Sequence, residues 1–219
     1  MSTQMGADTF YRYVQDFGFG ELTDVDLAGE VSGQYWLPED TAYWHDSNLG
    51  TNAFGQGLSV TPMQMVVAFA TVANDGERMR PHIVRQRKFA DGVVSVYQPI
   101  VEERVISAET ARTLTDVLVR VVEEGATQAR VDGYRMAGKT GTAQIWVPGG
   151  YDNEGTIASF VGYGPVPDPQ FVILVKLDRP KTSPWGSQTA ALSFQRLASR
   201  LCVLFNIPPQ EQELAEAAQ

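Results

Sequence analysis

Three short β-rich segments in the second half of the chain constrain its fold more than any other feature. They span residues 135–147, 157–163 and 171–177 and are rich in Val, Ile, Phe and Trp, residues that favour strands. The last two are joined by Pro165-Val-Pro-Asp-Pro169, a turn too short to hold a crossover helix. Strands joined by so short a connection pair antiparallel, so the sequence predicts an antiparallel sheet.

Helix signals lie before and after these strands. Four segments carry apolar side chains at helical spacing, namely residues 7–17, 61–73, 107–123 and 188–205. Helices, three successive strands and a closing helix predict an α+β domain, with an antiparallel sheet packed with helices. The expected domain covers residues 1–209, and residues 210–219 are expected to form a frayed acidic tail.

The helix at residues 61–73 has the clearest boundary signals. Thr61 is predicted as its N-cap and Pro62 as its first residue, and Gln64 completes a capping box. The helix at residues 107–123 is expected to bury one apolar face. That face consists of Leu114, Val117, Leu118 and Val121.

Composition excludes several classes of function. The 219 residues are 43% apolar and 20% charged, which is typical of a globular protein with its own core. A net charge of −9 and the lack of any Lys/Arg-rich run argue against a nucleic-acid-binding surface. The longest apolar runs are far shorter than the roughly 20 residues that span a bilayer. The single cysteine, Cys202, lies in an apolar helix pattern and is expected to be a buried structural thiol.

The start of the sequence leads almost directly into an amphipathic helix. Residues 1–6 contain nothing that would cap or cover the helix at residues 7–17. We therefore expect the sequence to be a piece cut from a longer chain, and its domain to be incomplete.

Residues 138–144, Gly-Lys-Thr-Gly-Thr-Ala-Gln, combine one cation, two hydroxyls and two glycines at the start of a β-run. Lys139 is one of only four lysines, so it does not belong to a lysine-rich surface. Lys139 supplies charge, Thr140 and Thr142 supply hydroxyl donors, and Gly141 lets another backbone approach closely. The segment therefore predicts a strand that binds a carboxylate and holds a polarised carbonyl.

The same residues also satisfy a rival motif. Residues 133–140, Gly-Tyr-Arg-Met-Ala-Gly-Lys-Thr, match the phosphate loop G-x-x-x-x-G-K-[ST], and Asp178 ends a hydrophobic strand as a magnesium-side aspartate would. A phosphate loop needs a helix directly after it, so that backbone N–H groups face the phosphates. Here Thr140 is followed by Gly141 and a β-branched, aromatic run, which predicts a strand. Nucleotide binding by residues 133–140 is the alternative function.

Several segments, in order along the chain, match one protein family. They are Phe17-Gly-Phe-Gly20, Phe54-Gly-Gln-Gly-Leu-Ser-Val-Thr-Pro-Met-Gln64, Ala73-Asn-Asp-Gly76 with Pro81, Glu124-Gly-Ala-Thr127, Ala137-Gly-Lys-Thr-Gly-Thr-Ala-Gln144 and Ser159-Phe-Val-Gly162. With them the chain resembles the C-terminal part of the transpeptidase domain of a class B penicillin-binding protein, a peptidoglycan D,D-transpeptidase. The resemblance extends from about Gly6 to Pro209 and implies a serine β-lactamase/transpeptidase-like fold.

In that family three motifs build one site: S-x-x-K with the nucleophilic serine, S-x-N, and K-T-G. None of the serines in this sequence begins S-x-x-K or S-x-N, so only K-T-G is present. Tyr151-Asp152-Asn153 spells the variant Y-x-N, but it follows K-T-G and is expected to be a polar loop. The resemblance implies that a missing N-terminal half supplies the other two motifs. A non-catalytic module with a transpeptidase-like shape is a further alternative.

The resemblance also implies a role for each K-T-G residue. Lys139 and Thr142 would be catalytic: Lys139 through its positive potential, and Thr142 through a backbone N–H that forms half of the oxyanion hole. Thr140, Gly141 and Thr142 would bind the substrate. The two hydroxyls would hold the terminal carboxylate of a D-Ala-D-Ala stem peptide or of a β-lactam, and Gly141 would leave room for the peptide as an added strand.

The implied reaction is acyl transfer through a serine ester, which crosslinks peptidoglycan stem peptides in the cell wall. The chain alone is expected to be inactive because it lacks the nucleophile. No metal or organic cofactor is implied, and no nucleic-acid partner. The expected location is the extracytoplasmic side of the cell membrane, with membrane contact only through an anchor that this sequence does not contain.

Overall fold

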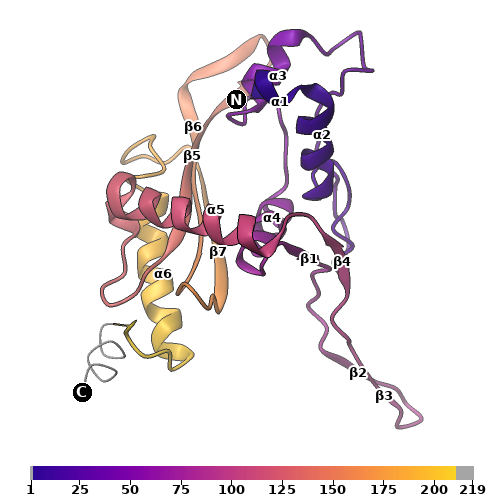
Figure 1. Cartoon of the computed structure of the whole chain (residues 1–219), viewed down its shortest axis with the longest axis vertical. Helices are drawn as coiled ribbons and strands as arrows, with labels where there is room; N and C mark the ends of the chain where they lie inside the picture. The colour runs from indigo at the N-terminus through magenta and orange to yellow at the C-terminus, as the bar shows by residue number, and fades with distance from the viewer. Residues whose placement is uncertain (1, 211–219) are drawn as a thin grey trace. The chain divides into compact units, whose positions relative to one another are not determined.

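The computed structural model describes residues 2–210, and the chain divides into two compact units. The first consists of Met1–Thr71 and Gly76–Ser107, and the second of Val72–Asp75 and Ala108–Gln219. Residues 211–219, in the tail expected to be frayed, lie outside the described residues. Figure 1 labels the elements of both units.

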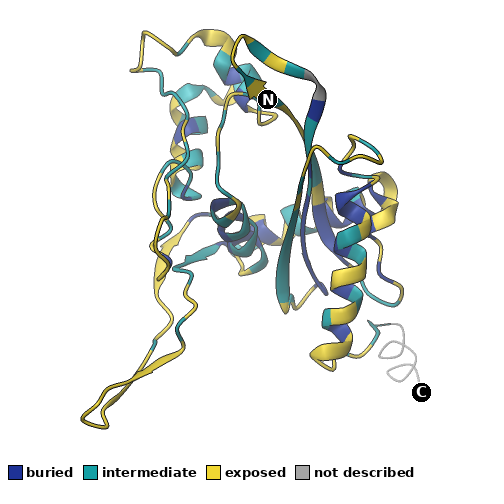
Figure 2. Cartoon of the chain, turned by 180° about the vertical axis from the view of Figure 1, so that it is seen from behind, coloured by how far each residue is buried: buried dark blue, intermediate teal, exposed yellow. Residues whose placement is uncertain are grey.

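The first unit contains most of the N-terminal helices and two small antiparallel ribbons. The helices are α1 (Ser2–Met5), α2 (Ala7–Asp16), α3 (Asp46–Asn52) and α4 (Pro62–Ala73), and α4 ends in the second unit. The ribbons pair β1 (Glu77–Met79) with β4 (Val101–Arg104), and β2 (Gln86–Lys88) with β3 (Val94–Val96). The β2–β3 hairpin is almost entirely exposed (Figure 2).

The capping box predicted for α4 is confirmed. The Thr61 hydroxyl accepts a hydrogen bond from the Gln64 backbone N–H at 3.1 Å, and the Gln64 side-chain oxygen accepts one from the Thr61 N–H at 2.8 Å. The buried Gln64 amide also donates to the carbonyls of Glu21 and Ser32, at 2.8 and 2.7 Å. One side chain therefore starts the helix and fastens the irregular segment before it.

The second unit is built on the antiparallel sheet that the sequence predicts. Its strands are β5 (Ala137–Val147), β6 (Gly150–Gly164) and β7 (Phe171–Asp178), in the spatial order β5-β6-β7. Helix α5 (Ala108–Arg120) precedes them, followed by a π-helical turn and a 3₁₀ turn, η1 (Val121–Gly125) and η2 (Thr127–Ala129). The closing helix α6 (Ala190–Leu204) lies alongside the sheet and contacts β6 and β7 (Figure 1).

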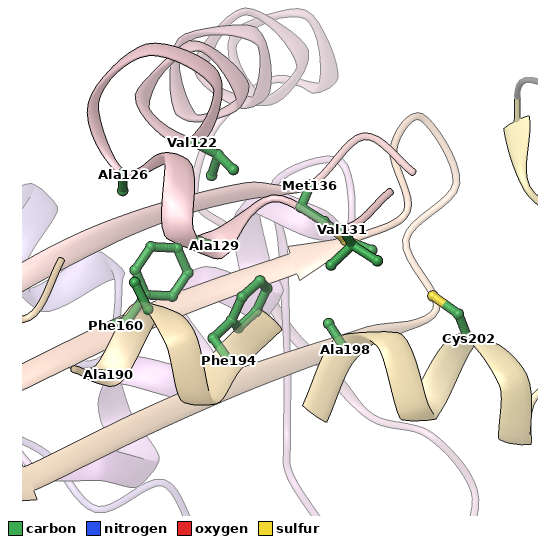
Figure 3. Packing of buried hydrophobic residues seen from close by; sticks show 11 residues of the cluster. Val122, Ala126, Ala129, Val131, Met136, Phe160, Ala190, Phe194, Ala198 and Cys202 are labelled. Carbon is green, nitrogen blue, oxygen red and sulfur yellow. The ribbon is translucent and has the colours of Figure 1, made fainter. Parts of the chain in front are cut away.

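The core of the second unit lies between α6 and the sheet (Figure 3). Phe160 of β6 and Phe194 of α6 are both fully buried, and their ring centroids lie 4.7 Å apart. Small helix residues, Ala190 and Ala198, are buried beside Phe194, which lets α6 approach the sheet closely. This packing fixes the position of β6 and, through their shared ladder, that of β5.

One detail of the predicted helix at residues 107–123 is wrong. Val117, expected on its buried face, is 44% exposed, whereas Val119 and Val122 are buried instead. The α-helix ends at Arg120 and continues as the wider π-helical turn of η1. Val117 and Val119 both precede this turn, so the buried face differs within the α-helix itself. The buried positions are Ala111, Leu118, Val119 and Val122, at the i, i+7, i+8, i+11 spacing of one helix face, and Val117 lies outside that face.

No helix among residues 2–210 has the length and the apolar character that a membrane span requires.

Candidate active site

The strand that carries Lys-Thr-Gly-Thr is an edge strand with one buried and one open end. Ala137 and Gly138 are buried, Lys139 is exposed, and residues 142–144 are exposed as well. On one side β5 pairs with β6, and on its other side it pairs with no strand among the described residues. Backbone N–H and C=O groups that face an unpaired edge can hydrogen-bond an extended ligand as an additional strand.

Lys139 places an exposed positive charge on this edge strand. Its Nζ donates a hydrogen bond to the carbonyl oxygen of the next residue, Thr140, at 3.0 Å. In the described part of the chain no carboxylate forms an ion pair with this lysine. Because no acid of the described residues pairs with it, the Lys139 charge can attract an anion that lies along β5.

The two threonine side chains lie on one face of the strand. Thr140 and Thr142 are two residues apart, and they pair with Phe160 and Ala158, which are fully buried. The Thr142 hydroxyl oxygen accepts a hydrogen bond from the backbone N–H of Gly186 at 3.2 Å. Because this oxygen acts as an acceptor there, the hydroxyl proton of Thr142 remains able to donate to another oxygen.

Two glycines keep the backbone around these threonines close-packed. A Cβ on Gly141 would lie 2.5 Å from the Ser159 side-chain oxygen, directly across the ladder. A Cβ on Gly186 would lie 2.4 and 2.5 Å from the backbone carbonyl oxygens of Ser159 and Gly141. The turn before α6 therefore rests on the backbone of β5 and β6 with no room for a side chain.

We expect Gly186→Ala to move this turn away from β5 and to break its contact with Thr142, because both nearest atoms belong to backbone and cannot rotate away. Overpacking of this kind costs about 1–3 kcal/mol, and each kcal/mol lowers the Tm of a chain of this size by roughly 2–4 °C. Gly125→Ala is the matched control, since a Cβ there meets no atom within 4 Å. Equal Tm values for the two variants would show that the turn is not held as described.

Gly186 and Ser159 are the site neighbours to which sequence analysis assigns no role. Gly186 lies 44 positions from Thr142 in the sequence, and no periodic pattern connects a turn to a distant strand. Ser159 stands opposite Gly141 because of the β5–β6 register. Counting from the turn would not have found it, because the ladder shifts between Gln144 and Trp146, and an unshifted register would place Thr156 opposite Gly141.

The phosphate-loop alternative requires a helix directly after Thr140. Residues 137–147 instead form strand β5. The backbone N–H groups of that segment belong to a sheet and do not converge at a helix N-terminus, so the geometry does not favour a phosphate site here.

The Tyr151-Asp152-Asn153 segment is strand, and the prediction of a polar loop is wrong. It lies in β6, where Tyr151 pairs with Trp146. Asp152 forms an ion pair with Arg179 at 3.1 Å, just beyond the end of β7. The side chain of Asn153 lies outside the described residues, so the Y-x-N pattern gains no structural support as a second motif.

Two further reactive side chains are buried and serve packing. Cys202 is 1% exposed, as predicted, and burial raises the pKa of its thiol, which keeps it protonated and unreactive at neutral pH. Tyr163 is fully buried, with its hydroxyl 2.8 Å from the Thr115 hydroxyl, and burial raises its pKa. Among residues 2–210 no group of three or more His, Cys, Asp or Glu side chains could hold a metal ion.

Comparison with known proteins identifies the family. The family model described as the penicillin binding protein transpeptidase domain matches residues 1–199. The chain is 38% identical to penicillin-binding protein PbpB of Mycolicibacterium smegmatis over 95% of its own length and 34% of that protein. It is 39% identical to stage V sporulation protein D of Bacillus subtilis, over 87% of this chain and 30% of that protein. The chain thus spans about a third of the length of the curated relatives it matches.

Solved structures agree with the sequence comparison. Penicillin binding protein 3 of Mycobacterium tuberculosis, complexed with ampicillin, superposes with a TM-score of 0.86 at 34% identity, covering 95% of this chain and 48% of that one. The transpeptidase domain of penicillin-binding protein 3 from Burkholderia pseudomallei gives 0.82 at 30% identity, covering 95% and 60%. The predicted α+β, transpeptidase-like fold is confirmed. The chain belongs to the penicillin-binding protein transpeptidase domain family.

Proposed function

We propose that this chain is the part of a peptidoglycan D,D-transpeptidase that holds the carboxyl end of a D-Ala-D-Ala stem peptide. The observation that carries this proposal is the edge strand β5, where an exposed ammonium group with no ion-pair partner among the described residues stands beside two threonines. Two relatives that are named peptidoglycan D,D-transpeptidases, from Mesostigma viride and Buchnera aphidicola, support the reaction class.

Each residue of the strand has a defined part in binding. Lys139 attracts the terminal carboxylate, and the hydroxyls of Thr140 and Thr142 donate hydrogen bonds to its oxygens. The peptide backbone lies along the free edge of β5 as an added strand, and Gly141 leaves space for it. A β-lactam carries a carboxylate beside its reactive carbonyl, so it occupies the same positions.

The Thr142 backbone N–H has the catalytic part. It donates a hydrogen bond to the substrate carbonyl oxygen as negative charge develops there. Loss of one such donor lowers kcat by a factor of about 10²–10³. The attacking serine and its lysine come from an S-x-x-K segment outside these 219 residues. The S-x-N motif also comes from outside them. The serine oxygen forms an ester with the penultimate D-Ala as terminal D-Ala leaves, and the amine of a second stem peptide then replaces the serine.

Such a protein acts where peptidoglycan lies, on the extracytoplasmic side of the cell membrane.

Labelling with a fluorescent penicillin tests this proposal. We expect no denaturation-resistant labelled band from the 219-residue chain, and a strong one from a longer protein that joins it to S-x-x-K and S-x-N segments. Replacing the serine of S-x-x-K by alanine in the longer protein is the control and should abolish the band. A labelled band from the short chain would contradict the assignment of the nucleophile. No label on either protein would favour a non-catalytic transpeptidase-like module.

A further inference from the structure

Two aromatic side chains stand exposed at the far end of the strand that carries Lys139. Trp146 of β5 is 69% exposed and Tyr151 of β6 is 43% exposed. They pair directly across the ladder, with ring centroids 5.5 Å apart and ring planes nearly perpendicular. By contrast, Phe160, Phe194 and Tyr163 of the same unit are fully buried in its core.

The position of this pair follows from the direction in which a bound peptide must leave. Its carboxyl end lies at Thr140 and Thr142 in the proposed function, on which this inference rests. Toward Ala137 the strand is buried, whereas beyond Thr142 residues Ala143, Gln144 and Trp146 are exposed. The amino-terminal part of the peptide can therefore continue only toward Trp146. Trp146 is four residues past Thr142, about 13 Å at the rise of a strand.

The chemistry of the pair fits a sugar. A pyranose ring has one or two faces made of C–H groups, which pack on the flat face of an aromatic ring, while its hydroxyls need polar groups at the edge. Trp and Tyr combine a large apolar surface with an N–H or O–H at the rim. A polar side chain, the exposed Gln144, lies two residues before Trp146 on the same strand.

We infer that Trp146 and Tyr151 form a platform for the glycan strand to which the stem peptide is attached. In peptidoglycan the amino end of the stem peptide is joined to an N-acetylated hexosamine. A stem peptide held by its carboxyl end at Lys139 carries this sugar toward the open end of β5, where the aromatic pair stands. The platform binds the sugar by stacking, and K-T-G binds the acidic end of the peptide.

Saturation-transfer NMR with the 219-residue chain tests the platform directly, using N,N′,N″,N‴-tetraacetylchitotetraose as the probe. We expect transfer from the protein to the ring C–H protons of the sugar. Trp146→Ala should weaken binding about fivefold to tenfold, the loss expected when one aromatic stack is removed. Trp146→Phe should retain most of the binding, and Tyr151→Ala should reduce it less than Trp146→Ala does.

The matched control is Phe54→Ala, which removes an aromatic ring that is 76% exposed in the first unit. Binding should be unchanged in this variant, and circular dichroism and Tm should show that all variants are folded. Equal affinity of Trp146→Ala and the unaltered chain for the chitotetraose, or no saturation transfer at all, would overturn the inference.

A second probe separates this inference from the proposed function. A diacetyl-Lys-D-Ala-D-Ala peptide, which carries no sugar, should bind in a manner that depends on Lys139 and not on Trp146. The chitotetraose should show the opposite dependence. If the peptide does not bind, or binds equally well to Lys139→Ala, the proposed function is wrong. If the chitotetraose binds equally well to Trp146→Ala, the platform is wrong.

Discussion

Lys139→Ala is expected to slow acylation by a β-lactam about a hundredfold in a protein that joins this chain to its S-x-x-K segment. The ammonium group of Lys139 has no acidic partner among the described residues, so its charge is available to a bound carboxylate. A hydrogen bond to a charged group contributes about 1.5–3 kcal/mol. A preorganised charge or donor at the reacting carbonyl raises the rate constant by a factor of about 10²–10³. The measurement is the second-order rate constant of acylation by a fluorescent penicillin.

Lys176→Ala is the matched control for this prediction. Lys176 is an exposed lysine of β7 in the same sheet, so its removal changes the net charge equally and leaves β5 intact. Its acylation rate should stay within about twofold of the unaltered protein, because β6 separates β7 from β5. Two strand spacings amount to roughly 10 Å, a distance at which the interaction of exposed charges is largely screened by salt. If Lys139→Ala and Lys176→Ala are acylated at the same rate, the lysine of K-T-G has no part in the reaction.

The strand identity of the site residues could be predicted from the sequence because local rules decide it. Residues 145–147, Ile-Trp-Val, are β-branched or aromatic, and the short proline-rich turn after β6 leaves only an antiparallel partner. The boundaries of α4 were equally local, because Thr61 and Gln64 satisfy each other within one turn of helix.

The remaining features depend on contacts between distant residues. Residues 150–156 contain Gly, Asp and Asn, which favour a loop, yet β6 begins at Gly150 because the strand pairs back on Trp146 and Val147. The position of Gly186 over Gly141 depends on how the turn before α6 packs on the sheet. Local propensity contains no information about either contact, so sequence analysis found the chemistry of the strand and missed its support.

Phe194→Ala is expected to lower the free energy of unfolding of the second unit by about 3–5 kcal/mol. The Phe194 side chain is fully buried against Phe160, with Ala190 and Ala198 beside it (Figure 3). These alanines are too small to fill the cavity that the lost ring leaves between α6 and Phe160. The loss is a large share of the roughly 5–15 kcal/mol that stabilises a typical domain.

The change should appear as a lower midpoint in urea unfolding followed by circular dichroism, with an unchanged slope m if only stability is altered. Leu197→Ala is the control on the same helix, since Leu197 is 49% exposed and its truncation leaves no cavity. It should cost about 0.5 kcal/mol or less. Because Phe160 stands opposite Thr140 in the ladder, Phe194→Ala should also loosen β5 and reduce peptide binding below the unfolding midpoint. A midpoint for Phe194→Ala that equals that of Leu197→Ala would mean that α6 does not hold the sheet in place.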